Sequence, residues 1–202
     1  MLYYLIRAMR KLNIPAVKRS YVHRTAKICS GSQFVFSKID RYSYVGSNSI
    51  VQNATIGAFC SIADGVIIGG SNHPVEWGST SPVFVAGRNI LSKNFSFHHF
   101  IETIGTEIGS DVWVGNNVLI KSGVKIGHGA IIGMGSVVTK SIPDYEIWAG
   151  NPARFIRKRF HQDTIDKLLY LKWWELSDSE IKAFSRDINK VDVFVQSLME
   201  KL

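Results

Sequence analysis

Residues 108–138 read IGSDVWVGNNVLIKSGVKIGHGAIIGMGSVV, and in this stretch an aliphatic residue returns at every sixth position. The aliphatic positions are Ile108, Val114, Ile120, Ile126, Ile132 and Val138. A period of six fits neither an α-helix nor a simple amphipathic strand. Each hexad instead fits one short strand followed by a tight turn, with the aliphatic side chain pointing inward.

A similar series of hexads precedes this stretch. Its aliphatic residues are Ile39, Val45, Val51, Ile56, Ile62 and Ile68, with one five-residue step between the third and the fourth. Three such strands form a triangular coil, and stacked coils bury a continuous core. The sequence therefore predicts an all-β solenoid of parallel strands. A β-sandwich rich in glycine and valine is disfavoured, because sandwich strands do not repeat at a strict spacing of six.

Small residues and glycines recur at fixed places in the hexads. Glycine follows the aliphatic residue at positions 46, 57, 69, 109, 115, 127 and 133. A small or β-branched residue stands four positions after the aliphatic residue, as at Ser43, Ser49, Cys60, Val112, Val118, Val124, Ala130 and Ser136. We expect the small residues to fill the corners of the coil, and the glycines to permit backbone turns that other residues resist.

The chain divides into three predicted segments. Residues 1–27 form a basic N-terminal segment, residues 28–155 form the β-helix, and residues 156–202 form a helical tail. Residues 70–103 break the hexad period and are rich in aromatic and polar residues, which indicates an inserted loop. In the tail, apolar residues follow helical spacing, and Ser177 is the expected N-cap of a second helix.

Charge is concentrated at the N-terminus. The chain has a net charge of +8, and residues 1–27 alone carry seven lysines and arginines and no acid. A basic end suits anionic lipid or another polyanion, or it is simply a solvated charged segment; a nucleic-acid partner is not expected. Leu2, Leu5, Ile6, Met9 and Leu12 would share one face of a helix. Residues 1–13 are therefore expected either to lie on a membrane surface or to cap the open end of the solenoid.

The remaining composition limits the location of the protein. No run of eighteen apolar residues exists, so no spanning helix is expected. The first residues lack a small-residue cleavage site, so a signal peptide is not expected. The two cysteines, Cys29 and Cys60, give no disulfide framework and fit a reducing compartment. We expect a cytoplasmic protein, with the inner face of the membrane as the place of any surface association.

Three segments resemble the xenobiotic acetyltransferases, a family of hexapeptide-repeat acyltransferases. These are NHPVEWGSTSPVF at 72–84, the block from 108 to 160, and TIDKLLYLKWWEL at 164–176. The family includes chloramphenicol and streptogramin O-acetyltransferases and relatives that acetylate sugars of surface polysaccharides. The resemblance implies a left-handed parallel β-helix, acetyl transfer from acetyl-coenzyme A to a hydroxyl, and homotrimers with active sites between neighbouring subunits.

His73 is the expected catalytic residue. An alcohol attacking a thioester needs a base to take its proton, and histidine suits this because its ordinary pKa lies near neutrality. By resemblance, His73 matches the catalytic histidine of the family and would act by direct transfer, with Glu76 as a candidate to orient it. Among the other histidines, His98 and His99 are expected to pack in the loop, and His128 is expected to be solvated.

The resemblance also implies binding residues for both substrates. Asn116 and the turn formed by Gly133, Met134, Gly135 and Ser136 should line the pantetheine arm of acetyl-coenzyme A. Thr139 and Lys140 should approach its pyrophosphate, and Arg154, Arg157 and Lys158 its 3′-phosphate. Candidate acceptor-binding residues are Tyr42, Tyr44, Asn53 and Trp77.

Three functions remain open from the sequence. An O-acetyltransferase acting on a sugar of a surface polysaccharide or its precursor is favoured, because a basic amphipathic N-terminus would place it near lipid-linked substrates. The second is an antibiotic O-acetyltransferase, and the third is a membrane- or polyanion-binding β-helix without enzymatic activity. No metal is expected, because His128 is the only histidine within the regular hexads.

Overall fold

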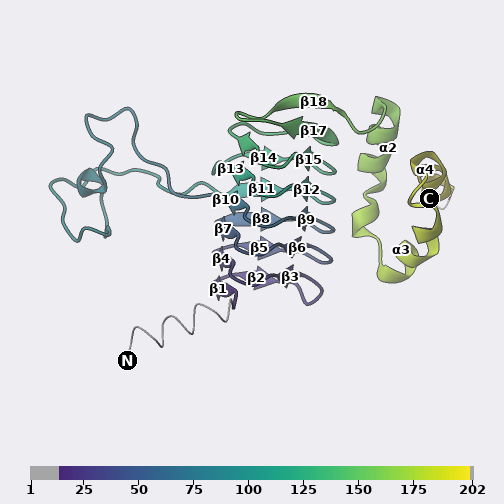
Figure 1. Ribbon diagram of the computed structural model, residues 1–202, viewed down its shortest axis with the longest axis horizontal. Coiled ribbons are helices and arrows are strands. Elements are labelled where there is room, and N and C mark those ends of the chain that lie inside the picture. The colour runs from purple at the N-terminus through teal and green to yellow at the C-terminus, as the bar shows by residue number, and fades with distance from the viewer. Residues whose placement is uncertain (1–13, 201–202) are drawn as a thin grey trace.

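The structure is a computed structural model that describes residues 14–200. Short strands stack into three sheets that form the sides of a coil (Figure 1). The first sheet contains β1 (Ala16–Lys18), β4 (Gln33–Val35), β7 (Ile50–Gln52), β10 (Ile67–Ile68), β13 (Leu119–Ile120) and β16 (Val137–Val138). The second contains β2 (Tyr21–Val22), β5 (Lys38–Ile39), β8 (Ala54–Ile56), β11 (Thr106–Ile108) and β14 (Lys125–Ile126). The third contains β3 (Lys27–Ile28), β6 (Tyr44–Val45), β9 (Ser61–Ile62), β12 (Trp113–Val114), β15 (Ile131–Ile132), β17 (Glu146–Ala149) and β18 (Arg154–Lys158).

The hexad residues form the core of this solenoid. Neighbouring coils pair in parallel, so that Ile56, Ile108 and Ile126 lie in one line across the second sheet. All twelve predicted aliphatic positions are at most 3% exposed and belong to one continuous cluster. Burial of each such side chain contributes about 1.5–3 kcal/mol before entropy is counted. The predicted parallel β-helix with an inserted loop and a helical tail is confirmed.

The chain turns from sheet to sheet at three stacked corners. We call the turns that lead from the first sheet to the second the first corner, as at Asn53 and Lys140. The second corner leads from the second sheet to the third, as at Asp111 and His128. The third corner leads back to the first sheet, as at Asn117. Each predicted functional residue can be placed by the corner on which it lies.

Buried serines join the coils at these corners. The hydroxyl of Ser43 donates to the carbonyl of Gly57 at 2.7 Å and accepts from the backbone amide of Cys60 at 2.9 Å. Ser32 and Ser49 make the same type of bond to neighbouring coils. The small residues therefore fill the corners as predicted, and their hydroxyls also satisfy backbone groups that would otherwise be buried without partners.

Six of the seven glycines after the aliphatic residues have a different role from the one predicted; the exception is Gly69, which has a positive φ of 86°. At Gly46 and Gly115 the backbone does not adopt a positive φ. A Cβ at Gly46 would instead lie 2.5 Å from the carbonyl carbon of Ala63, and one at Gly115 would lie 2.6 Å from the amide nitrogen of Met134. These glycines are needed because the next coil passes too close for a side chain. Positive φ occurs elsewhere in the turns, for example at Asn117 (φ 57°).

The solenoid begins earlier than predicted. Strands β1, β2 and β3 form a complete coil within residues 16–28, paired in parallel with the coil above. The prediction ended the basic N-terminal segment at residue 27 and placed the start of the solenoid at residue 28. The first coil has no glycine after its aliphatic residues, and its side chains are exposed or only half-buried. The proposed helix of residues 1–13 lies outside the described residues.

Three helices cover the second corner. They are α2 (Gln162–Leu171), α3 (Asp178–Phe184) and α4 (Val191–Met199), with short 3-10 turns at η2 (Trp173–Glu175) and η3 (Ser185–Asp187). Their apolar faces form a second core cluster with Ala58 and Tyr145 of the solenoid. The predicted cap is confirmed, because Ser177 forms a capping box with Glu180. No helix of the described chain has the length and apolarity needed to cross a bilayer.

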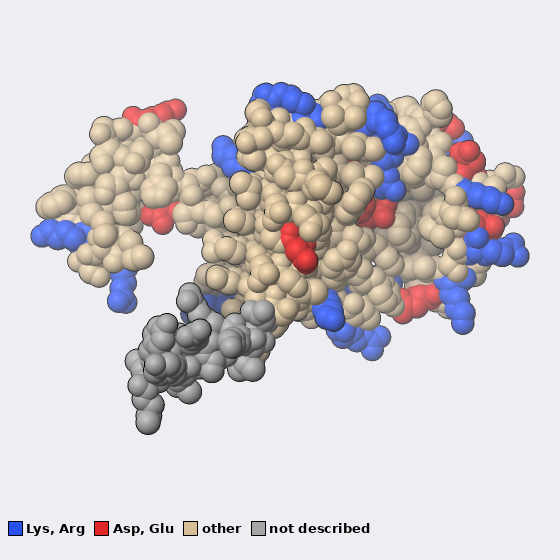
Figure 2. Space-filling view, in the orientation of Figure 1, with Lys and Arg blue, Asp and Glu red and all other residues tan. Residues whose placement is uncertain are grey.

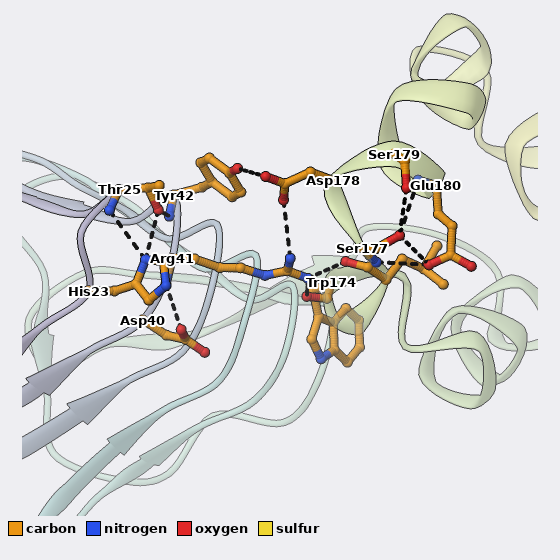
Figure 3. Close-up of polar contacts among 11 residues, drawn as sticks. His23, Thr25, Asp40, Arg41, Tyr42, Trp174, Ser177, Asp178, Ser179 and Glu180 are labelled. Atoms are coloured by element: carbon orange, nitrogen blue, oxygen red, sulfur yellow. Dashed lines mark hydrogen bonds and ion pairs between the residues drawn. The ribbon is translucent and has the colours of Figure 1, made fainter.

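A polar clasp holds the tail to the second corner (Figure 3). The guanidinium of Arg41 donates to the carbonyl oxygens of Trp174 and Leu176 and lies 3.4 Å from the Asp178 carboxylate. The hydroxyl of Tyr42 donates to the same carboxylate at 2.6 Å. The hydrogen bond to Asp178 raises the pKa of Tyr42. These bonds satisfy carbonyls between η2 and α3 that have no partner within the helices.

Candidate active site

The inserted loop leaves the solenoid at the first corner. It connects β10 to β11, includes η1 (Pro82–Phe84), and projects away from the coils on the side opposite the tail helices (Figure 1). Its two ends are joined where the backbone amide of Asn72 donates to the carbonyl of Glu102 at 2.7 Å. The hydroxyl of Ser122 donates to the side-chain oxygen of Asn72 at 3.0 Å, which ties the base of the loop to the next coil.

His73 follows this anchor directly and is exposed to solvent. Its Nδ1 lies 3.0 Å from the backbone carbonyl oxygen of Thr80. Because a carbonyl oxygen can only accept a hydrogen bond, Nδ1 carries the proton and Nε2 presents its lone pair. The neutral imidazole is therefore held in the tautomer that a general base requires. The predicted orienting residue, Glu76, makes no hydrogen bond or ion pair with His73, and the Thr80 carbonyl takes that role.

A pocket of about 760 Å³ lies in the same loop. Its lining includes Trp77 and Ser79 from the turn between His73 and Thr80, and residues from the far side of the loop: Phe84, Ser96, His98 and His99. The Trp77 ring meets the rings of His98 and Phe100 edge-on, with centroids 5.6 and 5.8 Å apart. The pocket thus combines one aromatic wall with hydroxyl and imidazole groups, in the loop that carries His73; His73 itself is not part of its lining.

The surface of the loop is largely uncharged (Figure 2). Among the residues from 69 to 105, several large apolar side chains are 60% exposed or more: Val75, Ile90, Leu91, Phe95, Phe97 and Ile101. Several large apolar side chains exposed within one loop are typical of an interaction surface.

Comparison with known proteins agrees with this geometry. Residues 105–140 match the family model described as bacterial transferase hexapeptide (six repeats). A probable macrolide acetyltransferase of Lysinibacillus sphaericus is 42% identical over 142 residues, which are 69% of this chain and 76% of that protein. A chloramphenicol acetyltransferase of Agrobacterium fabrum is 40% identical over 131 residues, which are 63% of this chain and 62% of that protein.

The chain belongs to the hexapeptide-repeat acetyltransferases of the xenobiotic type. A solved structure supports the fold alone: the N-acyltransferase AntD of Bacillus cereus, determined with dTDP-4-amino-4,6-dideoxyglucose and coenzyme A, superimposes with a TM-score of 0.56. It is 17% identical, and the match covers 83% of this chain and 96% of AntD.

The predicted pantetheine residues of this acetyltransferase lie together on the third corner. The backbone amide of Gly135 donates to the carbonyl of Asn116 at 2.8 Å, so the two turns are stacked. Met134 is 78% exposed at the tip of its turn. Ser136 differs from its neighbours: it is fully buried, and its hydroxyl donates to the Gly133 carbonyl at 2.6 Å. Its side chain therefore serves the coil and cannot reach a bound ligand.

Thr139 and Lys140 lie on the first corner, above the point where the loop leaves. Both are exposed. The outer face of the first sheet joins this corner to the third, and the side chains on it align across coils at Ile67, Leu119 and Val137. The hexapeptide-repeat acetyltransferase thus has an apolar strip between its predicted pantetheine turns and its predicted pyrophosphate residues.

The three predicted 3′-phosphate residues do not converge on one point. All lie on β18, which runs antiparallel to β17 across the top of the third sheet (Figure 1). Arg154 pairs with Ala149 beside the third corner. Lys158 lies at the opposite end of the strand, near the tail, where its ammonium donates to the side chain of Gln162. The prediction grouped them by sequence, but an extended strand spreads five residues over about 17 Å.

Two of the four predicted acceptor residues lie in the loop that carries His73 or at its junction with the coils. Trp77 lines the loop pocket, and the carbonyl of Asn53 accepts from the amide of Thr106 where the loop returns to the coils. Tyr42 lies at the second corner, away from the loop of its own chain, where its hydroxyl donates to Asp178. Tyr44 lies on the outer face of the third sheet, in line with Ser61 and Trp113 and away from the loop.

The structure also corrects the expectation for His128. Its ring stacks on the indole of Trp174, with centroids 4.6 Å apart and planes inclined by 10°. Its Nδ1 accepts a hydrogen bond from the backbone amide of Ser110 at 2.9 Å. The residue is therefore packed between the coils and the tail rather than solvated.

Neither cysteine lies near His73. Cys60 is buried, which raises the pKa of its thiol to about 12, and its sulfur lies 3.0 Å from the carbonyl of Gly109. Cys29 lies in the first coil, at the third corner. Among residues 14–200, no three His, Cys, Asp or Glu side chains come together in the way a metal ion would need.

Proposed function

We propose that this acetyltransferase transfers an acetyl group from acetyl-coenzyme A directly to a hydroxyl, with His73 as the general base. The observation that supports this most is the bond between Nδ1 and the Thr80 carbonyl. Nε2 accepts the proton of the acceptor hydroxyl as its oxygen bonds to the acetyl carbonyl carbon. The tetrahedral adduct then collapses, the carbon–sulfur bond breaks, and the imidazolium returns the proton to the departing thiolate.

The Thr80 carbonyl also assists after proton transfer. Once Nε2 is protonated, Nδ1–H still donates to this carbonyl, and the positive ring strengthens that hydrogen bond. The arrangement resembles the role of the third member of a catalytic triad, with a backbone oxygen in place of a carboxylate. No side chain needs to supply the orientation.

The residues around the first sheet fit acetyl-coenzyme A as co-substrate. Its pantetheine arm needs backbone groups and an apolar surface, which the turn Gly133–Gly135 and the strip of Ile67, Leu119 and Val137 provide. Its phosphates need cations, and Lys140 lies exposed beyond the strip. The aligned positions support binding along this face, with the thioester directed toward the first corner and His73.

Replacing Lys140 by Ala is expected to raise KM for acetyl-coenzyme A about three- to tenfold and to change kcat by less than about twofold. The reason is that a phosphate contact remote from the thioester binds ground state and transition state alike. Steady-state kinetics of thiol release measure both constants. Lys38→Ala removes an exposed lysine from the outer face of the second sheet and serves as control. A lower kcat with an unchanged KM would contradict the placement of Lys140.

We propose the loop pocket as the acceptor site and a carbohydrate as the acceptor. The aromatic wall of Trp77 offers a face for an apolar side of the acceptor, while Ser79, Ser96 and His98 offer several hydrogen-bonding groups. A polyhydroxylated ring satisfies such groups better than a compact apolar molecule does. The sugar of a surface polysaccharide or its precursor has this chemistry.

An antibiotic acceptor is the second candidate. It is favoured by the relatives, which are named for macrolide, chloramphenicol and virginiamycin acetylation at about 40% identity. A screen of chloramphenicol, a streptogramin, a macrolide and nucleotide- or lipid-linked sugars, read by thiol release, separates the two. Turnover of an antibiotic, with no activity on any of the sugars, would rule out a carbohydrate as the acceptor.

We expect the protein to be a homotrimer in solution. Apolar side chains of the loop, such as Ile90 and Phe97, are not covered by other residues of the described part of the same chain. Burial against a neighbouring copy removes this surface from water. Light scattering should give a particle of about three times the chain mass of 22.6 kDa. A particle with the mass of one chain would contradict the proposal.

Association with a membrane surface through residues 1–13 is a separate proposal. Its support is the basic amphipathic pattern of that segment and the seven cations within residues 1–27. Sedimentation with anionic liposomes should recover more of the whole chain than of a chain lacking residues 1–13, and added salt should reduce the difference. Equal and negligible sedimentation of both chains would exclude this role.

A further inference from the structure

A cavity of about 150 Å³ lies between the second corner and the tail helices. Its polar lining is Asp111, Tyr145 and Arg159. Its apolar lining comes from the tail: Phe160, Leu168, Trp173, Ile188, Val191 and Phe194. The loop that carries His73 projects from the other side of the molecule (Figure 1), so this cavity is separate from the proposed site of acetyl transfer.

The hydroxyl of Tyr145 lacks a partner in this cavity. The residue is fully buried, and its oxygen makes no hydrogen bond. The indole N–H of Trp173 lies on the same cavity wall and opposes the rise in the pKa of Tyr145 that burial causes. An indole N–H can only donate, so it gives the hydroxyl proton of Tyr145 no acceptor. A buried hydroxyl without a partner is unfavourable, because it has lost its hydration without compensation. The group is therefore available to a molecule that enters the cavity.

The tyrosine ring cannot turn away to satisfy its hydroxyl elsewhere. It packs directly on the backbone of Gly129, where any Cβ would overlap the ring. The guanidinium of Arg159 lies 5.4 Å from the ring centroid on another side. The hydroxyl is thus held in place at the cavity wall.

The charges of the cavity are already balanced. Arg159 donates to the carboxylate of Asp111 at 2.9 Å and to the carbonyl of Gly129 at 2.7 Å. A charged ligand would leave one uncompensated charge in a largely buried place, which is strongly unfavourable. The occupant should therefore be neutral, with one oxygen atom for Tyr145 and an apolar body for Leu168, Val191 and Phe194.

We propose that this cavity binds a small neutral molecule with one aromatic ring and one hydroxyl, of the phenol class. The size agrees, because an engineered apolar cavity of about 150 Å³ in another protein takes up benzene. The ring of the ligand packs against the tail helices, and its oxygen accepts a hydrogen bond from the hydroxyl of Tyr145. Binding then fills space between the tail and the coils and stabilises their contact.

Phenol is the probe, and toluene, which has a methyl group in place of the hydroxyl, is the matched ligand. The wild-type protein is expected to bind phenol saturably and more tightly than toluene, as measured by calorimetry and by shifts of methyl resonances from the tail. In Tyr145→Phe the affinity for phenol should fall about fivefold, the effect of one neutral hydrogen bond. The affinity for toluene should change by less than about twofold.

Two further variants complete the test. Tyr170→Phe removes an exposed tyrosine hydroxyl from α2 and should leave both affinities unchanged. Val191→Phe fills the cavity and should abolish both, in a protein whose circular dichroism shows it to be folded. A wild-type protein without saturable phenol binding, an unchanged phenol affinity in Tyr145→Phe, or binding that persists in Val191→Phe would each overturn the proposal. None of these measurements depends on acetyl transfer.

Discussion

Replacing His73 by Ala is expected to lower kcat by about two or more orders of magnitude without unfolding the protein. Loss of a general base typically costs a factor of about 10²–10⁴. The side chain is exposed, and the anchor of the loop runs through Asn72 and Ser122, so the fold does not depend on the imidazole. Thiol release at saturating concentrations of both substrates measures the effect, and the thermal midpoint checks folding.

His161→Ala is the matched control, because it removes an exposed histidine that makes no side-chain cap to α2. Its kcat should stay within about twofold of the wild type. The loop pocket offers two other imidazoles, His98 and His99. Near-normal turnover in His73→Ala would remove the central proposal, and a large loss in His98→Ala or His99→Ala alone would assign the base to that residue.

The hexads predicted the core of the molecule well because they encode a purely local rule. Each aliphatic residue must point inward once per strand, so positions such as Ile62 and Ile132 follow from spacing alone. The first coil was not predicted because its residues follow this rule less clearly. Val22 and Ile28 are only partly buried at the end of the stack, and the pattern there lacks the glycines that follow the aliphatic residues of later coils.

The corner on which a residue lies decides which of the other predicted functional residues share its surface. Ser136 and Lys140 are four positions apart, yet they lie on different corners, because one strand of the first sheet separates them. The sequence therefore could not show that an apolar strip lies between the predicted pantetheine turn and the predicted pyrophosphate residues. It did indicate the inserted loop, since the loss of the hexad period marks its two ends.

Long-range packing accounts for the remaining differences. Tyr42 and His128 occupy outward positions of regular hexads, and the hexad rule predicts solvent for such positions. The tail helices cover both of them, through Asp178 and Trp174. Likewise, the group that orients His73 is the backbone carbonyl of Thr80, which every residue type carries and no side-chain pattern reveals.

Replacing Arg159 by Met is expected to lower the free energy of unfolding by about 2–4 kcal/mol at neutral pH. The Arg159–Asp111 pair is partly buried, and removing one partner leaves the other charge largely out of water and uncompensated, which is destabilising. Arg159 also donates to the carbonyl of Gly129 and packs on the rings of Tyr145 and Phe160. Denaturant titration measures the loss.

Arg186→Met is the control, because Arg186 is exposed and pairs only loosely with Asp187. Its free energy of unfolding should change by less than about 0.5 kcal/mol.

The loss in Arg159→Met should depend on pH in a defined direction. Burial raises the pKa of Asp111 above its usual range, and Arg159 opposes this by its charge and its hydrogen bond. Without Arg159 the pKa of Asp111 in the folded protein rises further. The folded state then holds a proton that the unfolded state has released, so stability falls as pH increases from about 4, the ordinary pKa of the side chain, through the folded value. Below about pH 4 the difference in unfolding free energy from the wild type should shrink to the part caused by lost packing.

The double variant Asp111→Asn/Arg159→Met should recover part of the stability that Arg159→Met loses, and it should lose this pH dependence. A loss that stays constant from pH 3 to pH 8 would show that the charge of Asp111 does not contribute to it.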